Sequence, residues 1–337
     1  MSLFALKEGR HWLLYLLMPI LLLALSVVSL GVGYVDMSPL RLLQGTWEGE
    51  LLASRILLEL RVPRTALCLL VGAVLGLAGA ALQGLLRNPL AEPSLLGVSS
   101  GAALGAVLAL YSGFADAFAL ALPLAGLLGT ALALGIVFAL AGRGSSSNTL
   151  VLAGVAVSSL FGALIALTLN WAKTPTAVSE IVFWMMGSLA DRSNHELLLA
   201  TPFMLVGALL LLRCRRGLAA LSLGEETAHS LGVNLGRLRT LVLLGTACCV
   251  GAAVSVAGTI GFIGLVAPHL MRPLVRGDAA RLLPASALAG AILLTLADLG
   301  VRLMHTQTAE LKLGVLTSLV GAPFFLLLIL RHRSQDV

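Results

Sequence analysis

Apolar runs that are long enough to cross a lipid bilayer recur along nearly the whole sequence. An α-helix needs roughly 20 residues to cross about 30 Å of hydrocarbon. With 58% hydrophobic and only 11% charged residues, the 337-residue chain lacks the polar side chains to cover a water-exposed surface. The sequence therefore predicts an all-α polytopic membrane protein, with residues 1–337 forming a single transmembrane domain.

The runs, and the charged or Pro/Gly-rich breaks between them, predict about ten spans. The first run is too long for the apolar core of a signal peptide and lacks a cleavage site, so an uncleaved helix is expected. A further apolar segment, residues 181–190, is too short to span and is predicted to lie at the interface as a short helix. The predicted spans are 12–32, 65–86, 94–111, 117–141, 149–171, 193–213, 238–257, 260–275, 282–304 and 311–330.

The basic residues predict the orientation. If the N-terminus is cytoplasmic, the spans divide the lysines and arginines into 14 inside and 8 outside. The positive-inside rule then places both termini and residues 213–239 in the cytoplasm. The inside set is Lys7, Arg10, Arg87, Arg143, Arg213, Arg215, Arg216, Arg237, Arg239, Arg272, Arg276, Arg281, Arg331 and Arg333, and the outside set is Arg41, Arg55, Arg61, Arg64, Lys173, Arg192, Arg302 and Lys312.

A weak internal repeat joins the second and seventh spans. Residues 72–79 (GAVLGLAG) resemble residues 251–258 (GAAVSVAG) at an offset of 179. The two spans are five spans apart in the chain, so they cross the membrane in opposite directions. The second to fifth and the seventh to tenth spans are therefore predicted to be inverted repeats. The alternative is that helices rich in small residues resemble each other by composition. Glycines at helix spacing, such as Gly72 and Gly76, predict close helix packing in either case.

The sequence offers little for catalysis. It contains no Gly-x-x-x-x-Gly-Lys-Ser/Thr phosphate loop, no His-Glu-x-x-His motif and no paired carboxylates within a span. We therefore expect no enzyme active site, no metal site and no resident cofactor, and the distribution of charge does not favour nucleic-acid binding. Asp298 lies four residues before Arg302, which predicts a local ion pair. His269 is interpreted as a hydrogen-bonded structural histidine, and the four cysteines as unpaired core residues.

Five motifs occur in one order along the chain. They are residues 61–65 (RVPRT), 88–93 (NPLAEP), 223–232 (LGEETAHSLG), 258–269 (GTIGFIGLVAPH) and 314–324 (GVLTSLVGAPF). Together they resemble the permease subunits of bacterial ABC importers for ferric siderophores, haem and vitamin B12. The chain departs from that family at Lys312, where a proline is common, so the local turn there is expected to differ.

The resemblance implies a permease of ten helices in the bacterial inner membrane, paired with a second copy. It also implies two ATP-binding subunits that carry ATP and Mg, and a periplasmic binding protein that delivers the cargo, with a ferric siderophore as the first choice and haem or cobalamin next. An ion-coupled secondary transporter is the alternative, because inverted repeats are also typical of that class. That class needs a coupling-ion site, and Asp298, the deep carboxylate that the spans offer, already has Arg302 as a neighbour.

The resemblance further implies roles for individual residues. Arg61, Arg64 and Arg302 are expected to dock the binding protein, although arginines at these positions could equally anchor helix ends at the headgroups. The loop with Leu223, Gly224, Glu225, Glu226, Ala228, Leu231 and Gly232 is expected to couple to the ATPase, the alternative being a merely solvated loop. Asn88, Leu90, Ser147 and Asn148 are expected to form a cytoplasmic gate, whereas the residues alone favour a plain polar turn at 145–148.

Overall fold

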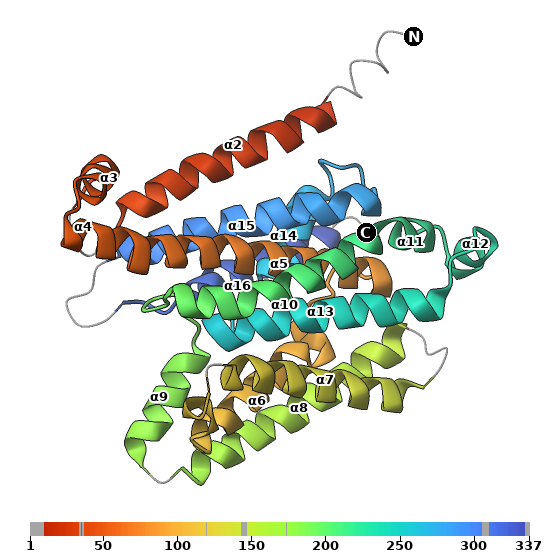
Figure 1. Cartoon of the computed structure of the whole chain (residues 1–337). Coiled ribbons are helices and arrows are strands. Elements are labelled where there is room, and N and C mark those ends of the chain that lie inside the picture. Colours follow the sequence, from red (N-terminus) through yellow and green to blue (C-terminus); the bar gives the residue numbers. More distant parts are fainter. Residues whose placement is uncertain are drawn as a thin grey trace.

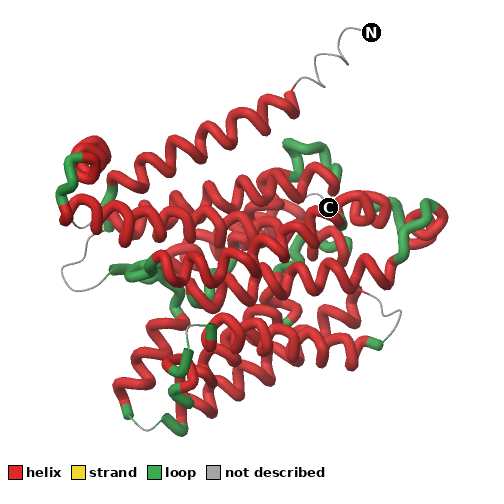
Figure 2. Tube along the Cα trace, in the orientation of Figure 1, coloured by secondary structure: helices red, strands yellow, loops and turns green. Residues whose placement is uncertain are grey.

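The computed structural model of the chain describes residues 10–33, 35, 37–118, 120–142, 147–172, 174–304 and 310–333. Within this part, helices joined by turns and loops form one bundle (Figure 2). We call the end of the bundle that carries α11 (Arg215–Leu221) and α12 (Glu225–Ser230) the α12 end. The opposite end, which carries α3 (Pro39–Trp47), α4 (Leu51–Arg55) and α9 (Pro175–Met185), is the α9 end (Figure 1).

The helices follow the ten predicted spans in order. Among the described residues, seven helical segments are long and apolar enough to cross a bilayer, and α6 is a shorter apolar helix. The nine residues of α14 rise only about 14 Å, so the predicted span at 260–275 is shorter than expected. The helices that correspond to the spans are α2 (Arg10–Gly31), α5 (Val62–Leu86), α6 (Val98–Tyr111), α7 (Ala121–Ala141), α8 (Ser147–Asn170), α10 (Asn194–Arg213), α13 (Leu235–Ala257), α14 (Ile263–Met271), α15 (Ala279–Leu303) and α16 (Leu313–Arg333).

The segment before α5 is helical, which the sequence analysis did not predict. It consists of α3 (Pro39–Trp47), α4 (Leu51–Arg55) and the π-helical η1 (Ile56–Arg61). Helix α3 begins at a Ser-Pro signal, because the Ser38 side chain accepts a hydrogen bond from the Arg41 N–H. Helix α4, η1 and α5 run on as one segment, Leu51–Leu86, and the π turn precedes Pro63, which has no N–H to donate.

The short helix between α8 and α10 also differs from its prediction. Helix α9 spans Pro175–Met185, so it begins six residues before the start of the predicted 181–190 and ends five residues before its end. It starts after the N-cap residue Thr174, whose side chain accepts a hydrogen bond from the Ala177 N–H. It stops because Gly187 adopts a positive φ of 75° and packs so closely that a Cβ there would lie 2.5 Å from the Thr259 carbonyl oxygen.

Close backbone contacts at glycines hold the long helices together. A Cβ built on Gly72 of α5 would lie 2.5 Å from the carbonyl oxygen of Gly290 on α15. One built on Gly101 of α6 would lie 2.5 Å from that of Gly129 on α7. Such distances leave room only for a hydrogen atom, so the close packing predicted from the glycine spacing is confirmed.

The two halves of the bundle repeat one packing scheme. Helix α5 packs on α14 and α15, and α13 packs in the same way on α6 and α7. Within the halves, α6 packs on α7 as α14 does on α15. Helix α5 starts at the α9 end, whereas α13 starts at the α12 end (Figure 1). The helices of the second half thus run opposite to those of the first, as the inverted repeat predicted.

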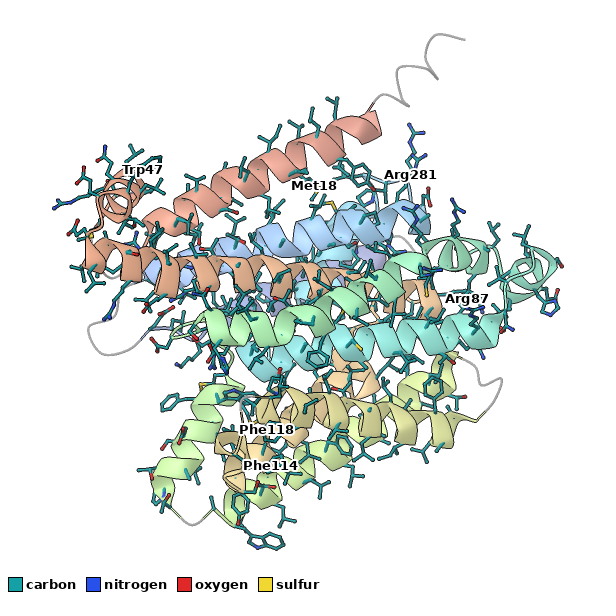
Figure 3. The ribbon with its side chains drawn as sticks, in the orientation of Figure 1. Met18, Trp47, Arg87, Phe114, Phe118 and Arg281 are labelled. Atoms are coloured by element: carbon teal, nitrogen blue, oxygen red, sulfur yellow. The ribbon has the colours of Figure 1, made fainter. Side chains whose placement is uncertain are left out.

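The remaining elements are short. They are η2 (Pro93–Leu96), η3 (Phe114–Asp116), α11 (Arg215–Leu221) and α12 (Glu225–Ser230). Figure 3 places Trp47, Phe114 and Phe118 towards the α9 end, and Arg87 and Arg281 at the α12 end.

Candidate functional site

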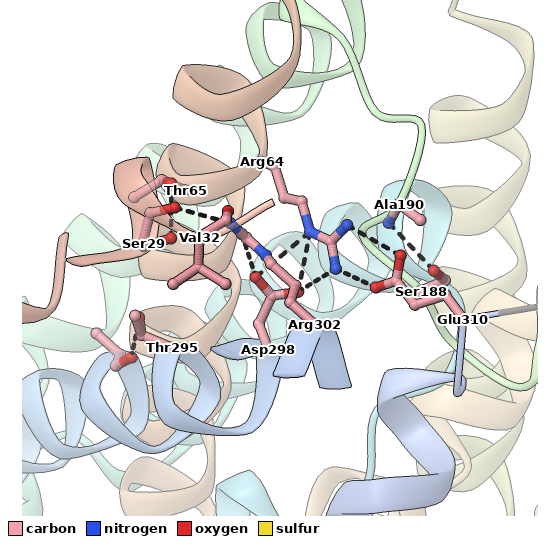
Figure 4. Close-up of polar contacts among 11 residues, drawn as sticks. Ser29, Val32, Arg64, Thr65, Ser188, Ala190, Thr295, Asp298, Arg302 and Glu310 are labelled. Atoms are coloured by element: carbon pink, nitrogen blue, oxygen red, sulfur yellow. Dashed lines mark hydrogen bonds and ion pairs between the residues drawn. The ribbon is translucent and has the colours of Figure 1, made fainter. Parts of the chain in front are cut away.

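A buried carboxylate between two arginines lies near the α9 end. Asp298 on α15 has a side chain that is 1% exposed. Its Oδ2 pairs with Arg302 Nη2 one turn later, which confirms the predicted ion pair. Its Oδ1 also accepts hydrogen bonds from Arg64 Nη2 (2.8 Å) and Nε (3.1 Å) on α5 (Figure 4). Two cations therefore satisfy one buried charge, which makes it unsuitable as a free coupling-ion site.

Arg64 also holds a second carboxylate. Its Nη1 donates to Glu310 Oε2 at 3.1 Å, and its Nη2 pairs with Glu310 Oε1 (Figure 4). The Arg64 and Glu310 side chains are 12% and 9% exposed. Arg64 thus connects α5, α15 and the segment that leads into α16. The sequence did not reveal Glu310 as a partner, because 246 positions separate the two residues in the chain.

The other two arginines bind backbone carbonyls. Arg61 donates to the carbonyl oxygens of Leu30 (2.7 Å), Gly31 (3.1 Å), Val35 (2.7 Å) and Met37 (3.1 Å). Arg302 Nη1 donates in turn to those of Ser29 (2.8 Å) and Val32 (3.1 Å). Both side chains are buried and hold the connection between α2 and α3.

The fold therefore brings together the three arginines predicted to dock a binding protein. Arg61, Arg64 and Arg302 line one cavity of about 110 Å³. Each guanidinium is bound to acceptors of the chain itself, so docking through them requires an exchange of partners. The docking role stays a prediction.

The predicted coupling loop forms one short helix, α12, at the α12 end. Gly224 precedes α12 with a φ of 114°, and Gly232 follows it with a φ of 79°. L-residues rarely adopt these angles, so the two glycines set the limits of the helix. Ala228 is buried, whereas Glu226 is exposed and the Leu223 and Leu231 side chains are 67% and 63% exposed. Two exposed leucines beside a charge suit contact with another protein, and the coupling role stays a prediction.

Glu225 on α12 faces back toward the bundle. Its Oε1 lies 3.1 Å from Arg239 Nη2 on α13 and 4.0 Å from Arg87 Nη2. Arg87 ends α5 in a left-handed conformation, with a φ of 50°. Glu225 is therefore distinct from the other predicted coupling residues, because it ties α12 to α13 and to the turn that follows α5.

That turn contains two of the four predicted gate residues. The Asn88 side chain accepts a hydrogen bond from the Leu90 N–H at 2.9 Å, which closes the turn around the intervening proline. Ser147 and Asn148 form the start of α8, but their side chains and residues 143–146 lie outside the described structure. The gate assignment stays a prediction.

A larger cavity of about 770 Å³ lies where the two broken helices of the repeats meet. The Glu92 carboxylate, in the break between α5 and α6, accepts a hydrogen bond (2.8 Å) from the Phe262 N–H, at the break between α13 and α14. Nothing in the sequence pattern indicates this role for Glu92. Broken helices that meet at a cavity are typical of transporter binding sites. The lining includes Glu92, Ser94, Ser99, Met185, Met186, Thr259, Ile260, Gly261, Gly314, Val315, Ser318, Leu319, Ala322, Pro323 and Leu326.

Three further expectations from the sequence concern Lys312, His269 and the four cysteines. Lys312 takes the N-cap position of α16, where its carbonyl oxygen accepts from the Val315 N–H (3.1 Å), and its Nζ lies 5.8 Å from the Phe183 ring centroid. The His269 ring meets Phe324 edge to face, with centroids 5.9 Å apart. The four cysteines are free thiols.

Comparison with known proteins gives matches over nearly the whole chain. The FecCD transport family matches residues 21–331. The hemin transport system permease protein HmuU of Yersinia pestis is 40% identical over 330 residues, 94% of this chain and 95% of HmuU. The vitamin B12 import system permease protein BtuC of Salmonella typhi is 39% identical over 334 residues, 96% of each chain. A solved transporter assigned to the metal-chelate type of ABC transporters, in an inward-facing conformation, matches with a TM-score of 0.82 at 34% identity, over 95% of this chain and 99% of that one.

Proposed function

This chain belongs to the FecCD transport family, and we propose that it is the membrane-spanning subunit of an ATP-driven importer for metal chelates. The end-to-end match to permeases of hemin and vitamin B12 importers carries this conclusion. The inverted repeat, with broken helices that meet at the 770 Å³ cavity, supports it, because such breaks place backbone polar groups where a substrate passes. We propose a ferric siderophore as the first cargo to test, followed by haem and cobalamin.

We propose that the α12 end faces the cytoplasm and the α9 end faces outward, across a bacterial inner membrane. Both described chain ends, Arg10 and Arg333, belong to the 14-residue basic set assigned to the inside, which supports this orientation. In that orientation α12, with exposed Leu223, Glu226 and Leu231, lies where a cytoplasmic ATP-binding subunit can contact it.

The partners follow from the same proposal. The chain is a transporter component, and ATP with its Mg is proposed to bind to two separate subunits below the α12 end. A second copy of the chain is proposed to complete the pathway. At the α9 end, Arg64 with Arg61 and Arg302 is proposed to receive acidic side chains of a substrate-binding protein, because a guanidinium binds a carboxylate through two parallel hydrogen bonds.

Uptake by a reconstituted complex tests the proposal. Proteoliposomes that contain this chain with its ATP-binding subunit should accumulate a labelled ferric siderophore when the cargo-loaded binding protein is outside and ATP is inside. Uptake should cease without ATP and persist when ion gradients are collapsed. Uptake that follows an ion gradient and ignores ATP would instead identify the ion-coupled secondary transporter. Parallel assays with haem and cobalamin decide the cargo.

A further inference from the structure

Arg64 has no free edge for a new partner. Its Nε and Nη2 face Asp298, and its Nη2 and Nη1 face Glu310, so both bidentate edges of the guanidinium are occupied. Four of its five N–H groups are therefore in use. A third carboxylate can bind in the same two-bond geometry only where one of these two leaves.

Glu310 is the carboxylate that can leave. Asp298 is the more buried of the two and is also held by Arg302. Glu310 is 9% exposed and lies outside the helices, three positions before α16 begins at Leu313. An incoming carboxylate therefore meets less resistance at Glu310 than at Asp298, whose departure would leave two buried arginines facing each other.

The release of Glu310 acts on a wall of the large cavity. The first turns of α16 supply Gly314, Val315 and Ser318 to the lining. The start of α16 is also held at Gly314, whose N–H donates a hydrogen bond to the Gly187 carbonyl oxygen at 3.3 Å. The ion pair with Arg64 is thus one of the contacts that hold the α9 end of α16 in place.

We infer that Glu310 occupies on Arg64 the position of an acidic side chain of the docking protein, so that docking releases the α9 end of α16 and opens the cavity. This inference rests on the proposed docking through Arg64. Glu310 then competes with the carboxylate of the docking protein for the Arg64 guanidinium. The partner group is a carboxylate, since it must match the charge and the bidentate geometry that Glu310 provides.

Thiol accessibility tests the release without any binding protein. In a variant that keeps only the buried Cys249 of the native cysteines, Ser318→Cys reports on the cavity and Cys249 reports on unfolding. An impermeant maleimide is added to the outside of proteoliposomes that contain the assembled complex, oriented with the α9 end outward. Glu310→Gln should speed labelling at position 318 by about tenfold or more, because it removes a hydrogen-bonded charge pair, and should leave Cys249 unlabelled. The matched control Glu59→Gln, an exposed carboxylate in η1, should leave the rate unchanged.

The binding protein identified by the uptake assay tests the exchange. Glu310→Gln should tighten its binding, and Arg64→Gln should weaken it, each by about tenfold. A labelling rate for Glu310→Gln equal to that of the parent, or matched by Glu59→Gln, overturns the release. Unchanged binding in Glu310→Gln alone overturns the competition. Unchanged binding in Arg64→Gln shows instead that the proposed docking site is wrong, and the labelling result still decides the release.

Discussion

At the scale of single residues, the environment of Asp298 decides what its charge can do. The carboxylate is buried and shared by Arg64 and Arg302, which come from α5 and α15. Breaking a buried ion pair costs much more than breaking an exposed one, because the remaining charge loses both its partner and its water. The arginines of this cluster therefore stabilise the α9 end whatever else they bind.

Replacing Asp298 tests this view. Asp298→Asn should lower the free energy of unfolding by about 3–5 kcal/mol, since it leaves the buried Arg302 without a carboxylate and Arg64 with Glu310 alone. The matched control lies on the same helix, where Asp278→Asn changes the partly exposed N-cap of α15 and its 3.2 Å pair with Arg281. Asparagine also caps helices well, so that loss should stay below about 1 kcal/mol. Denaturant unfolding in detergent measures both, and equal losses would contradict the account.

At the scale of helices, glycines determine how closely α5 packs against α15 and α6 against α7. Gly72→Ala should destabilise the bundle by about 1–3 kcal/mol, because its Cβ would lie 2.5 Å from the Gly290 carbonyl oxygen and the helices would have to separate. Gly135→Ala in α7 should instead stabilise it by about 0.5–1 kcal/mol, since a Cβ there meets nothing within 4 Å and alanine favours the helix. Thermal unfolding of both variants measures whether each substitution lowers or raises the stability of the bundle. A stabilised Gly72→Ala variant would show that the contact between Gly72 and Gly290 is not tight.

Helix α12 carries the prediction for coupling. Glu226→Arg should leave the chain folded in the membrane, because the side chain is exposed, and should lower assembly with the ATP-binding subunit or the ATP hydrolysis coupled to transport. Glu48→Arg, an exposed charge at the α9 end, is the control and should leave both unchanged. Copurification and ATPase assays measure the effect. Wild-type behaviour of Glu226→Arg would favour the alternative of a merely solvated loop.

At the scale of the whole molecule, the two ends of the bundle differ in charge and in shape. The 14-to-8 division of basic residues predicts the α12 end inside. In a cysteine-free background, Ser222→Cys at the α12 end should resist an impermeant thiol reagent added to whole cells, and Glu48→Cys at the α9 end should react. Permeabilised cells should label both. The reverse pattern would overturn the orientation. The outermost terminal residues, 1–9 and 334–337, lie outside the described structure.

Local patterns in the sequence determined the class of fold and the order of its elements. The apolar runs are long enough to specify where helices cross, because backbone polar groups in lipid must be satisfied within the helix itself. The glycine spacing likewise predicted the tight crossings, and the Asp298–Arg302 pair followed from the helix period. Where a helix departed from prediction, the cause was a local feature set by packing, such as the π turn before Pro63 or the tight contact of Gly187.

Only the tertiary structure decided which distant groups meet. Nothing in the spacing of residues along the sequence indicates that Arg64 binds Glu310 or that Glu92 accepts a hydrogen bond from the Phe262 N–H. The same is true of the hydrogen bonds that Arg61 donates to four carbonyl oxygens. Charged side chains in a bundle find partners across helices, because leaving them unpaired away from water is costly. Which partner they find depends on how the repeats pack, and that packing is a property of the whole bundle rather than of any one segment.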